Sequence, residues 1–235
     1  MKRYSAVTLL ELLIVMAVMF VLSTISVVVY RSLIDSFSIN EASLTVAQDI
    51  RAVQRAAMLL DREPDERWLH GIGIDFRKLK EEDAEGKQIY EYDIFKWCSS
   101  FDYYDRNEAS LTNEVPNLAN NADLGEINLA LVEPAVSSCP REVEEDVRLV
   151  TETKRFYQYD NLEFVLHGDV SIILFEAVSG KAFFYDEQGF LLNYALEGED
   201  IVMLPDFLTS YFSLEIIPKR GSDLHSRTLT VPPVS

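Results

Sequence analysis

Residues 1–30 read MKRYSAVTLLELLIVMAVMFVLSTISVVVY, and this stretch decides how the rest of the chain is interpreted. After the basic pair Lys2 and Arg3, the sequence is predominantly apolar from Val7 to Tyr30, without proline or glycine and with a single charge, Glu11. As a helix the run would be about 36 Å long, enough to cross a hydrocarbon core of about 30 Å. The basic residues before it favour a cytoplasmic N-terminus, with the remainder of the chain outside.

Three interpretations of this segment compete. A secretory signal peptide has the same basic start, but its apolar region is usually only about 7–15 residues long. Small residues at Ser23, Thr24 and Ser26 leave a signal-peptidase site open. A plain signal anchor, a single helix that tethers a domain, fits the length. Neither accounts for Glu11, because a carboxylate in an apolar membrane segment is costly and by default marks a function.

Glu11 gains a partner if the chain is cut between Ala6 and Val7. The new α-amino group would lie four residues before the carboxylate, and in a helical array the amine of a neighbouring subunit would neutralise it. A charge-assisted pair of this kind offsets much of the desolvation cost. It also sets the axial register between subunits, as buried polar groups do in coiled coils.

The stretch Ala6-Val7-Thr8-Leu9-Leu10-Glu11-Leu12-Leu13 resembles the prepilin cleavage and methylation motif of type IV pilins and type II secretion pseudopilins. The resemblance implies a leader over 1–6, processing after Ala6, methylation of Val7, and assembly through Thr8 and Glu11. Two positions depart from the family pattern, since Ala6 stands where glycine is usual and Val7 where phenylalanine or methionine is usual. The helix-breaking proline that many pilins carry later in the run is also missing here.

An amphipathic pattern follows in residues 39–60, where apolar side chains recur at spacings of three and four. They are Val46, Ile50, Val53, Ala57 and Leu60. No breaker separates this pattern from the membrane run, so one helix is expected from Thr8 to Leu60, ending before Pro64. The AQDIRAVQRAAM stretch, residues 47–58, and the entry into a strand at Leu69 are similar to H-type minor pseudopilins and related minor pilins.

The remainder predicts a β-rich head. Alternating apolar residues and turn signals indicate strands over 69–76, 88–97, 148–153, 162–166, 171–175, 181–185, 190–194, 211–217 and 228–231. Hairpins are expected between the strands 181–185 and 190–194, and between 211–217 and 228–231. Residues 99–146 are expected to form a long irregular excursion.

The expected fold class is therefore α+β, with a long helix packed on a C-terminal antiparallel β-sheet or small β-sandwich. Three parts follow along the chain: a leader over 1–6, the helix over 7–60, and the head over 61–235. Within the helix, residues 7–30 are expected to be transmembrane and residues 31–60 amphipathic.

The composition of the chain argues against some classes of function. The chain has 39 acidic and 21 basic residues, a formal net charge of −18, and such a surface repels nucleic acid. Cys98 and Cys139 are too far apart for a CxxC redox or zinc motif. They would form one disulfide if the head is exported to an oxidising compartment, and the sequence leaves that pairing open.

Catalytic and metal motifs are not found. His70, His167 and His225 are scattered, without an HExxH pattern, and no GxSxG nucleophile motif is present, so no enzyme is expected. Asp102, Asp105, Asn107 and Glu108 supply oxygen ligands in one loop and are a calcium candidate. They lack EF-hand spacing and its glycine, so solvated loop charge is the favoured interpretation and no cofactor is expected.

The favoured function is a structural subunit, a minor one, of a type IV pilus or a type II secretion pseudopilus. The resemblance implies as partners a prepilin peptidase, other pilin or pseudopilin subunits, an assembly platform protein and its ATPase. It places the chain in the cytoplasmic (inner) membrane and, after assembly, in an extracytoplasmic filament. The alternative is a single-pass, membrane-anchored β-domain that binds a ligand and never polymerises. The sequence does not separate secretion from adhesion, motility or DNA uptake.

The cleavage assignment predicts that Ala6→Leu blocks processing, because a peptidase pocket shaped for glycine or alanine excludes a leucine side chain. Ala6→Gly should be processed normally. Gel mobility and N-terminal sequencing of the mature protein measure both, and a mature protein of normal size from Ala6→Leu would contradict the assignment.

Overall fold

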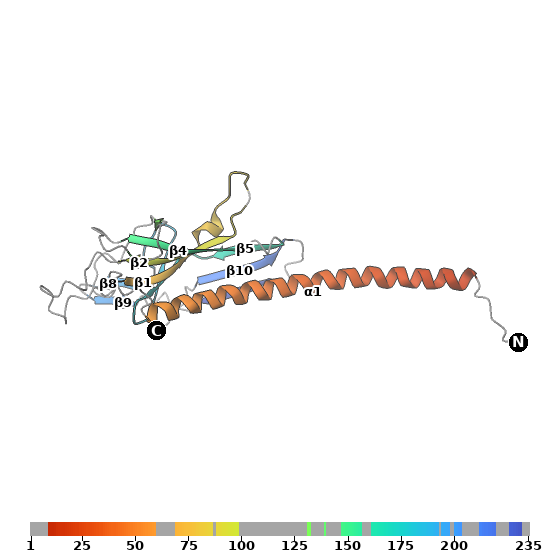
Figure 1. The fold of residues 1–235 in the computed structure, drawn as a ribbon, viewed down its shortest axis with the longest axis horizontal. Helices are drawn as coiled ribbons and strands as arrows, with labels where there is room; N and C mark the ends of the chain where they lie inside the picture. The colour runs from red at the N-terminus through yellow and green to blue at the C-terminus, as the bar shows by residue number, and fades with distance from the viewer. Residues whose placement is uncertain are drawn as a thin grey trace.

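The computed structural model describes residues 9–59, 69–86, 88–98, 131–132, 139, 147–156, 161–192, 194–197, 200–203, 212–219 and 226–231. The fold is α+β. One long helix, α1 (Leu9–Met58), lies beside β-sheets that gather along its C-terminal half, while its N-terminal half extends beyond them (Figure 1). The expected leader over 1–6, Val7 and Thr8 lie outside the described residues.

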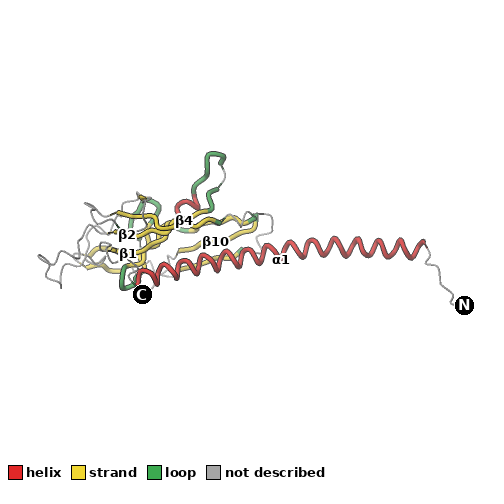
Figure 2. Tube along the Cα trace, in the orientation of Figure 1, coloured by secondary structure: helices red, strands yellow, loops and turns green. Residues whose placement is uncertain are grey.

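Helix α1 has 50 residues, which at about 1.5 Å per residue makes it roughly 75 Å long. It contains neither proline nor glycine, so nothing in its sequence interrupts the hydrogen-bond ladder. The expectation of one continuous helix through both the apolar and the amphipathic segments is confirmed over Leu9–Met58. Figure 2 shows the helix as a single uninterrupted element.

The larger sheet has six strands in the order β3-β4-β2-β1-β6-β7. Their bounds are β1 (Leu69–Asp75), β2 (Glu91–Cys98), β3 (Leu131–Val132), β4 (Val147–Arg155), β6 (Ile172–Glu176) and β7 (Ala182–Tyr185). A short 3₁₀ helix, η1 (Arg77–Lys80), follows β1. The expectation of a purely antiparallel sheet is wrong in one place, since β3 and β4 pair in parallel. The 14 residues between these two strands are a connection long enough for the parallel arrangement, which needs about a dozen.

The smaller sheets complete the head. The three-stranded sheet has the order β11-β10-β5, with β5 (Leu162–His167), β10 (Phe212–Pro218) and β11 (Arg227–Val231). The expected β10–β11 hairpin is confirmed. The other expected hairpin is confirmed in part: β7 meets the following segment in an antiparallel bridge between Tyr185 and Leu191, and the backbone N–H of Leu192 donates to the carbonyl of Phe184 at 2.8 Å. From Tyr194 onward the chain forms β8 (Tyr194–Glu197), which pairs with β9 (Asp200–Met203) across two residues, the shortest hairpin connection.

The sheets hold α1 through a stripe of buried apolar side chains that recur every three or four residues. They are Ile39, Ala42, Val46, Ile50, Val53 and Ala57. The predicted stripe is confirmed for its first four members, and its last, Leu60, lies outside the described residues. An aromatic cluster joins the two main sheets beneath the helix. In it Phe76, at the end of β1, contacts Tyr92 of β2 and Phe212 of β10, with ring centroids 5.2 and 4.6 Å apart.

Gly73 in β1 provides a test of this packing. A Cβ there would lie 2.7 Å from the carbonyl oxygen of Ile173 and as close to the ring of Phe95, so neither neighbour leaves room for a methyl group. Gly73→Ala should lower the free energy of unfolding by about 1–3 kcal/mol, as overpacking does. Gly168→Ala is the control, because it has open space around it and suffers only from its φ of 79°. Thermal unfolding of the solubilised chain should rank Gly73→Ala as the less stable variant, and the reverse order would contradict the packing.

Candidate functional site: helix α1 and its attachment to the head

The first part of α1, Leu9–Val27, is long and apolar enough to cross a membrane, and none of it is buried against the rest of the chain. Its large apolar side chains point outward on every side of the helix. A soluble helix buries such residues on one face. The chain therefore carries an apolar helix that its own head does not cover.

Three hydroxyl groups in this segment are bonded within the helix. Ser23, Thr24 and Ser26 donate to the carbonyl oxygens of Met19, Phe20 and Leu22, at 2.8, 2.6 and 2.8 Å. Hydroxyls bonded in this way need no water. The segment can therefore enter an apolar environment without leaving these polar groups unsatisfied.

Glu11 lies in the first turn of α1 and is exposed. A carboxylate at a helix N-terminus interacts favourably with the helix dipole. The other predicted processing and assembly residues, Ala6, Val7 and Thr8, lie outside the described residues. Of the predicted assembly residues the structure therefore places Glu11, at the end of the helix that is farthest from the head.

Beyond Val27 a second apolar stripe continues along α1. Tyr30, Leu33, Phe37 and Leu44 are all exposed, and we call them the outer stripe. At 3.6 residues per turn these positions lie on the face opposite the buried stripe, away from the head. Phe37, with 70% of its surface accessible, shows how fully this face is open.

Polar bridges fix the position of the head along α1. The hydroxyl of Tyr92 donates to the Asp49 carboxylate at 2.5 Å. Burial of Tyr92 and the adjacent Asp49 carboxylate raise the pKa of the phenol above its usual range, so it stays protonated and keeps donating. Nearer the membrane segment, Asn161 donates to Asp35 at 2.9 Å, and Arg227 donates to Asn40.

The turn between β6 and β7 closes the C-terminal end of α1. The backbone N–H of Val178 donates to the carbonyl oxygen of Ala57 at 2.9 Å, and Gln54 donates to the carbonyl of Gly180 at 3.3 Å. The last carbonyls of a helix have no partner within it, so the turn satisfies one of them. Helix and head are thus bonded at both ends of their contact.

Cys98, the last residue of β2, is joined to Cys139 by a disulfide, with Cα atoms 5.7 Å apart. Both cysteines are buried. The bond ties the end of β2 to the chain that leads toward β4, and it closes a loop across a sequence separation of 41 residues. Disulfides of this kind persist in oxidising compartments.

Two buried carboxylates of the larger sheet are paired with cations of η1. Arg77 donates to both carboxylate oxygens of Asp75, from Nε to Oδ1 at 3.0 Å and from Nη2 to Oδ2 at 2.6 Å. Lys78 pairs with Asp93 at 2.8 Å, and Thr153 donates to the same carboxylate at 2.7 Å. Within the described residues no group of three or more histidine, cysteine or carboxylate side chains could hold a metal ion. The predicted calcium candidates, Asp102, Asp105, Asn107 and Glu108, lie outside those residues.

Arg148 of β4 is a third buried charge. Burial lowers the pKa of its guanidinium to about 10, and the ring of Phe95 lies 5.4 Å from the guanidinium carbon. Among the residues that the structure describes, none accepts a hydrogen bond from it.

The histidines do not form one site. The His70 ring packs against Trp97 in the interior of the head, with centroids 4.9 Å apart. His167 bonds Glu215 at 2.7 Å on the exposed surface of the smaller sheet. His225 lies outside the described residues.

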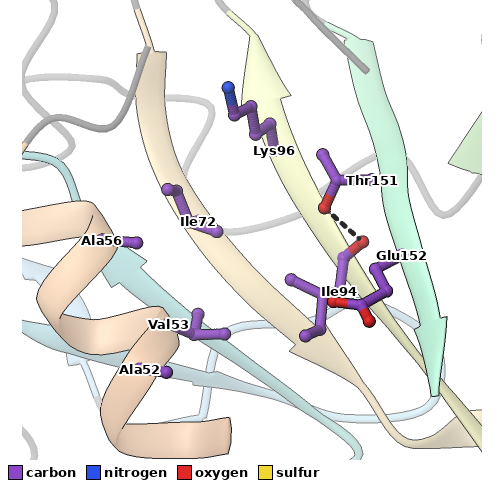
Figure 3. Close-up of a pocket in the computed structure, with 8 residues that line it drawn as sticks. All are labelled: Ala52, Val53, Ala56, Ile72, Ile94, Lys96, Thr151 and Glu152. Carbon is purple, nitrogen blue, oxygen red and sulfur yellow. Dashed lines mark hydrogen bonds between the residues drawn. The ribbon is translucent and has the colours of Figure 1, made fainter. Parts of the chain in front are cut away.

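A groove of about 370 Å³ opens between α1 and the strands β2 and β4. Ala52 and Ala56 line it from the helix, across from Ile94 and Glu152 on the strands (Figure 3). Val53, Ile72, Lys96 and Thr151 complete the lining. Most of the lining side chains are apolar, so the groove suits an apolar group from outside the chain.

No family model, curated protein or solved structure matches the chain. Sequence reasoning missed the groove, the Tyr92–Asp49 bridge and the Val178 turn. Each depends on which strand lies beside which helix turn, and hydrophobic periodicity carries no such information. The outer stripe was detectable, since Tyr30, Leu33, Phe37 and Leu44 have the spacing of an apolar helix face.

The disulfide predicts a labelling pattern. The exported protein should resist a thiol reagent under denaturing, non-reducing conditions and take up two labels after reduction, as counted by mass spectrometry. Cys98→Ser should expose one reactive thiol at Cys139 and lower the free energy of unfolding by about 2–5 kcal/mol. Two labels on the unreduced exported protein would rule out the bond.

Proposed function

We propose that this chain is a structural subunit, a minor one, of a type IV pilus or a type II secretion pseudopilus. In this proposal a prepilin peptidase cuts after Ala6 and methylates Val7. The subunit waits in the cytoplasmic membrane with its head outside. A platform protein and its ATPase then insert it into a filament, where α1 packs against the helices of other subunits.

The observation that carries the proposal is the exposure of the apolar N-terminal half of α1. Its first half is apolar on all sides and uncovered by the head, and Glu11 lies in its first turn. A bilayer accommodates the apolar side chains, but a carboxylate at membrane depth is costly. A bundle of neighbouring helices with a cationic N-terminus satisfies both, which favours assembly over simple anchoring.

The outer stripe supports the same conclusion. Phe37 and Leu44 lie in the part of α1 that contacts the head, yet they point away from it and are exposed. A helix that only tethers a domain needs no apolar face outside the membrane, because exposing such a face to water is unfavourable. Parallel helices in a filament core would bury this face together with the membrane segment.

The attachment of the head supports the proposal mechanically. The bridges at Asp35, Asn40 and Asp49, and the turn at Ala57, fix the head along the helix. A displacement of α1 along its axis therefore carries the head with it. Such rigid coupling suits a subunit that is extruded as a unit, and a ligand-capturing domain on a tether does not need it.

The groove between α1 and β4 is the one observation that favours the alternative function, a membrane-anchored binding module. Its volume of about 370 Å³ is within the range of small-ligand pockets. The two functions differ in the mature N-terminus and in filament content. A mature chain that starts at Met1 or after Ser26, and that is absent from sheared filaments, would select the binding module.

Glu11→Val separates assembly from anchoring. The substitution makes the membrane segment more apolar, so insertion should be unchanged or improved. It leaves the α-amine of the neighbouring subunit unpaired in an apolar core, and losing one member of a buried pair costs about 3–5 kcal/mol. The variant should therefore be processed, stable and membrane-bound, but depleted by orders of magnitude from sheared filaments and from crosslinks to other pilins.

Glu163→Val is the control, since it removes an exposed carboxylate from β5 in the head and leaves α1 unchanged. It should be recovered in filaments at near wild-type levels. If Glu11→Val is incorporated as well as the wild type, the carboxylate is not the register contact. A defect in insertion rather than in incorporation would instead point to the plain anchor.

A further inference from the structure

The larger sheet has a second face, which is turned away from α1 and which we call the far face. Ile72 and Ile94 line the groove beside the helix. Successive residues of a strand point to opposite faces, so Phe95 belongs to the far face. The guanidinium of Arg148 lies over the Phe95 ring. The far face is buried like the helix face, with 0% of the surface of Phe95 and 1% of that of Arg148 accessible.

Tyr185 belongs to the same face. The register across β2, β1, β6 and β7 places Phe183 in one row with Phe95, and Tyr185 is two residues further along β7. Tyr185 is fully buried. Burial raises the pKa of its phenol, and the charge of Arg148 opposes that rise. The two side chains therefore lie within electrostatic range of each other in the interior of the head.

The hydrogen-bond donors of both side chains are unused. Over the described ranges of the chain, the three guanidinium nitrogens of Arg148 and the hydroxyl of Tyr185 have no hydrogen-bond partner. A buried donor without a partner costs about 1–3 kcal/mol, and a buried charge costs more. Unsatisfied groups of this kind are rare in native proteins and call for a specific explanation.

The described buried carboxylates of the far face are engaged elsewhere. They are Asp75, Asp93 and Glu176. The field of Asp75 acts on Arg148, but both oxygens of that carboxylate accept hydrogen bonds from Arg77. Asp93 and Glu176 also accept hydrogen bonds from other side chains. Asp75 thus has two guanidinium groups near it and bonds one of them.

We propose that Arg148 and Tyr185 bind the carboxylate of a small organic acid inside the head. A guanidinium presents paired N–H donors in the plane and spacing of the two carboxylate oxygens, and the phenol adds an O–H donor. One monocarboxylate neutralises the one cation, whereas a dianion such as phosphate would bring a second charge into a buried site. Phe95 and Leu174, both fully buried on this face, offer apolar surface to the body of the acid.

The site is closed in this structure, so the acid enters through a local opening of the head. The strand β3 is at the edge of the sheet beside β4, and its Leu131 lies opposite Arg148. β3 has only two residues. Few ladder hydrogen bonds hold so short a strand, and elements of this kind open at the lowest free energy. Such opening sets the rate of binding, while the occupancy at equilibrium depends on the contacts of the bound acid.

The test measures the thermal midpoint of the full-length chain in detergent, with sodium propionate and with sodium chloride at equal ionic strength. The chains are the wild type, Arg148→Met, Tyr185→Phe and Arg51→Met. Arg51 is an exposed cation of α1, so Arg51→Met is the matched control for the loss of one positive charge. This measurement needs no filament, and its outcome is therefore independent of the proposed function.

Propionate should raise the midpoint of the wild type saturably above its value in chloride, as a ligand of the native state does. Arg51→Met should respond equally, and Arg148→Met should not respond. Tyr185→Phe should bind propionate about tenfold more weakly, because it lacks one donor to a charged acceptor. In chloride, Arg148→Met should be at least as stable as the wild type, because an apolar side chain replaces a buried charge without a partner.

A wild-type midpoint that does not respond to propionate, or an equal response of Arg148→Met, would overturn the proposal. A lower midpoint of Arg148→Met in chloride would show that the chain itself pairs Arg148, and it would rule out an acid from outside. Inorganic phosphate that raises the wild-type midpoint more than propionate does, without raising that of Arg148→Met, would refute the assignment to a carboxylate. Unchanged propionate affinity of Tyr185→Phe would remove Tyr185 from the site and overturn the proposal in its stated form.

Discussion

The buried stripe of α1, from Ile39 to Ala57, is the contact around which the rest of the molecule is arranged. Each of its larger side chains contributes roughly 1.5–3 kcal/mol by leaving water, while a whole domain is stable by only about 5–15 kcal/mol. Without this contact the two main sheets would lose the helix that both pack against and would be joined through the aromatic cluster around Phe76. The polar bridges from Asp35, Asn40 and Asp49 add little to that total. Their effect is on position, because each bonds only when the helix has one axial placement.

The N-terminal half of the same helix, in contrast, is not buried against the head. Its backbone is satisfied internally and its hydroxyls are bonded to the preceding turn, yet its apolar side chains have no cover within the chain. In this segment the hydroxyl groups are therefore hydrogen-bonded within the helix, while the apolar side chains are not buried by the chain. Lipid can supply that burial, and so can other helices. Exchange between the two environments needs no refolding, which is what insertion from a bilayer into a filament requires.

Features of one element were predictable from the sequence, and so was the hairpin between the neighbouring strands β10 and β11, but features that join elements far apart in the chain were not. The spacing of Val46, Ile50, Val53 and Ala57 is a property of one helix, and the structure buries all four. The segment 190–194 was expected to be one strand, but Leu191 bridges back to β7 while Tyr194 begins β8, which pairs with β9 across a two-residue connection. The parallel β3 strand is only two residues long and gives no periodic signal. The groove appears only when β2 and β4 are placed beside the helix.

The charge of the head bears on which contacts an assembly of this chain can use. Identical copies with a net charge of −18 repel one another when brought close. Salt screens such repulsion beyond about 8–10 Å, but heads in contact are closer than that. Ionic contacts between copies would need basic residues, and the chain has only 21 of them against 39 acidic residues. Apolar contacts do not depend on that balance. The outer stripe is apolar, and the proposed register pair at Glu11 is separated from the head by the N-terminal half of α1. The contacts in the proposed assembly thus do not depend on ionic pairs between the acidic heads.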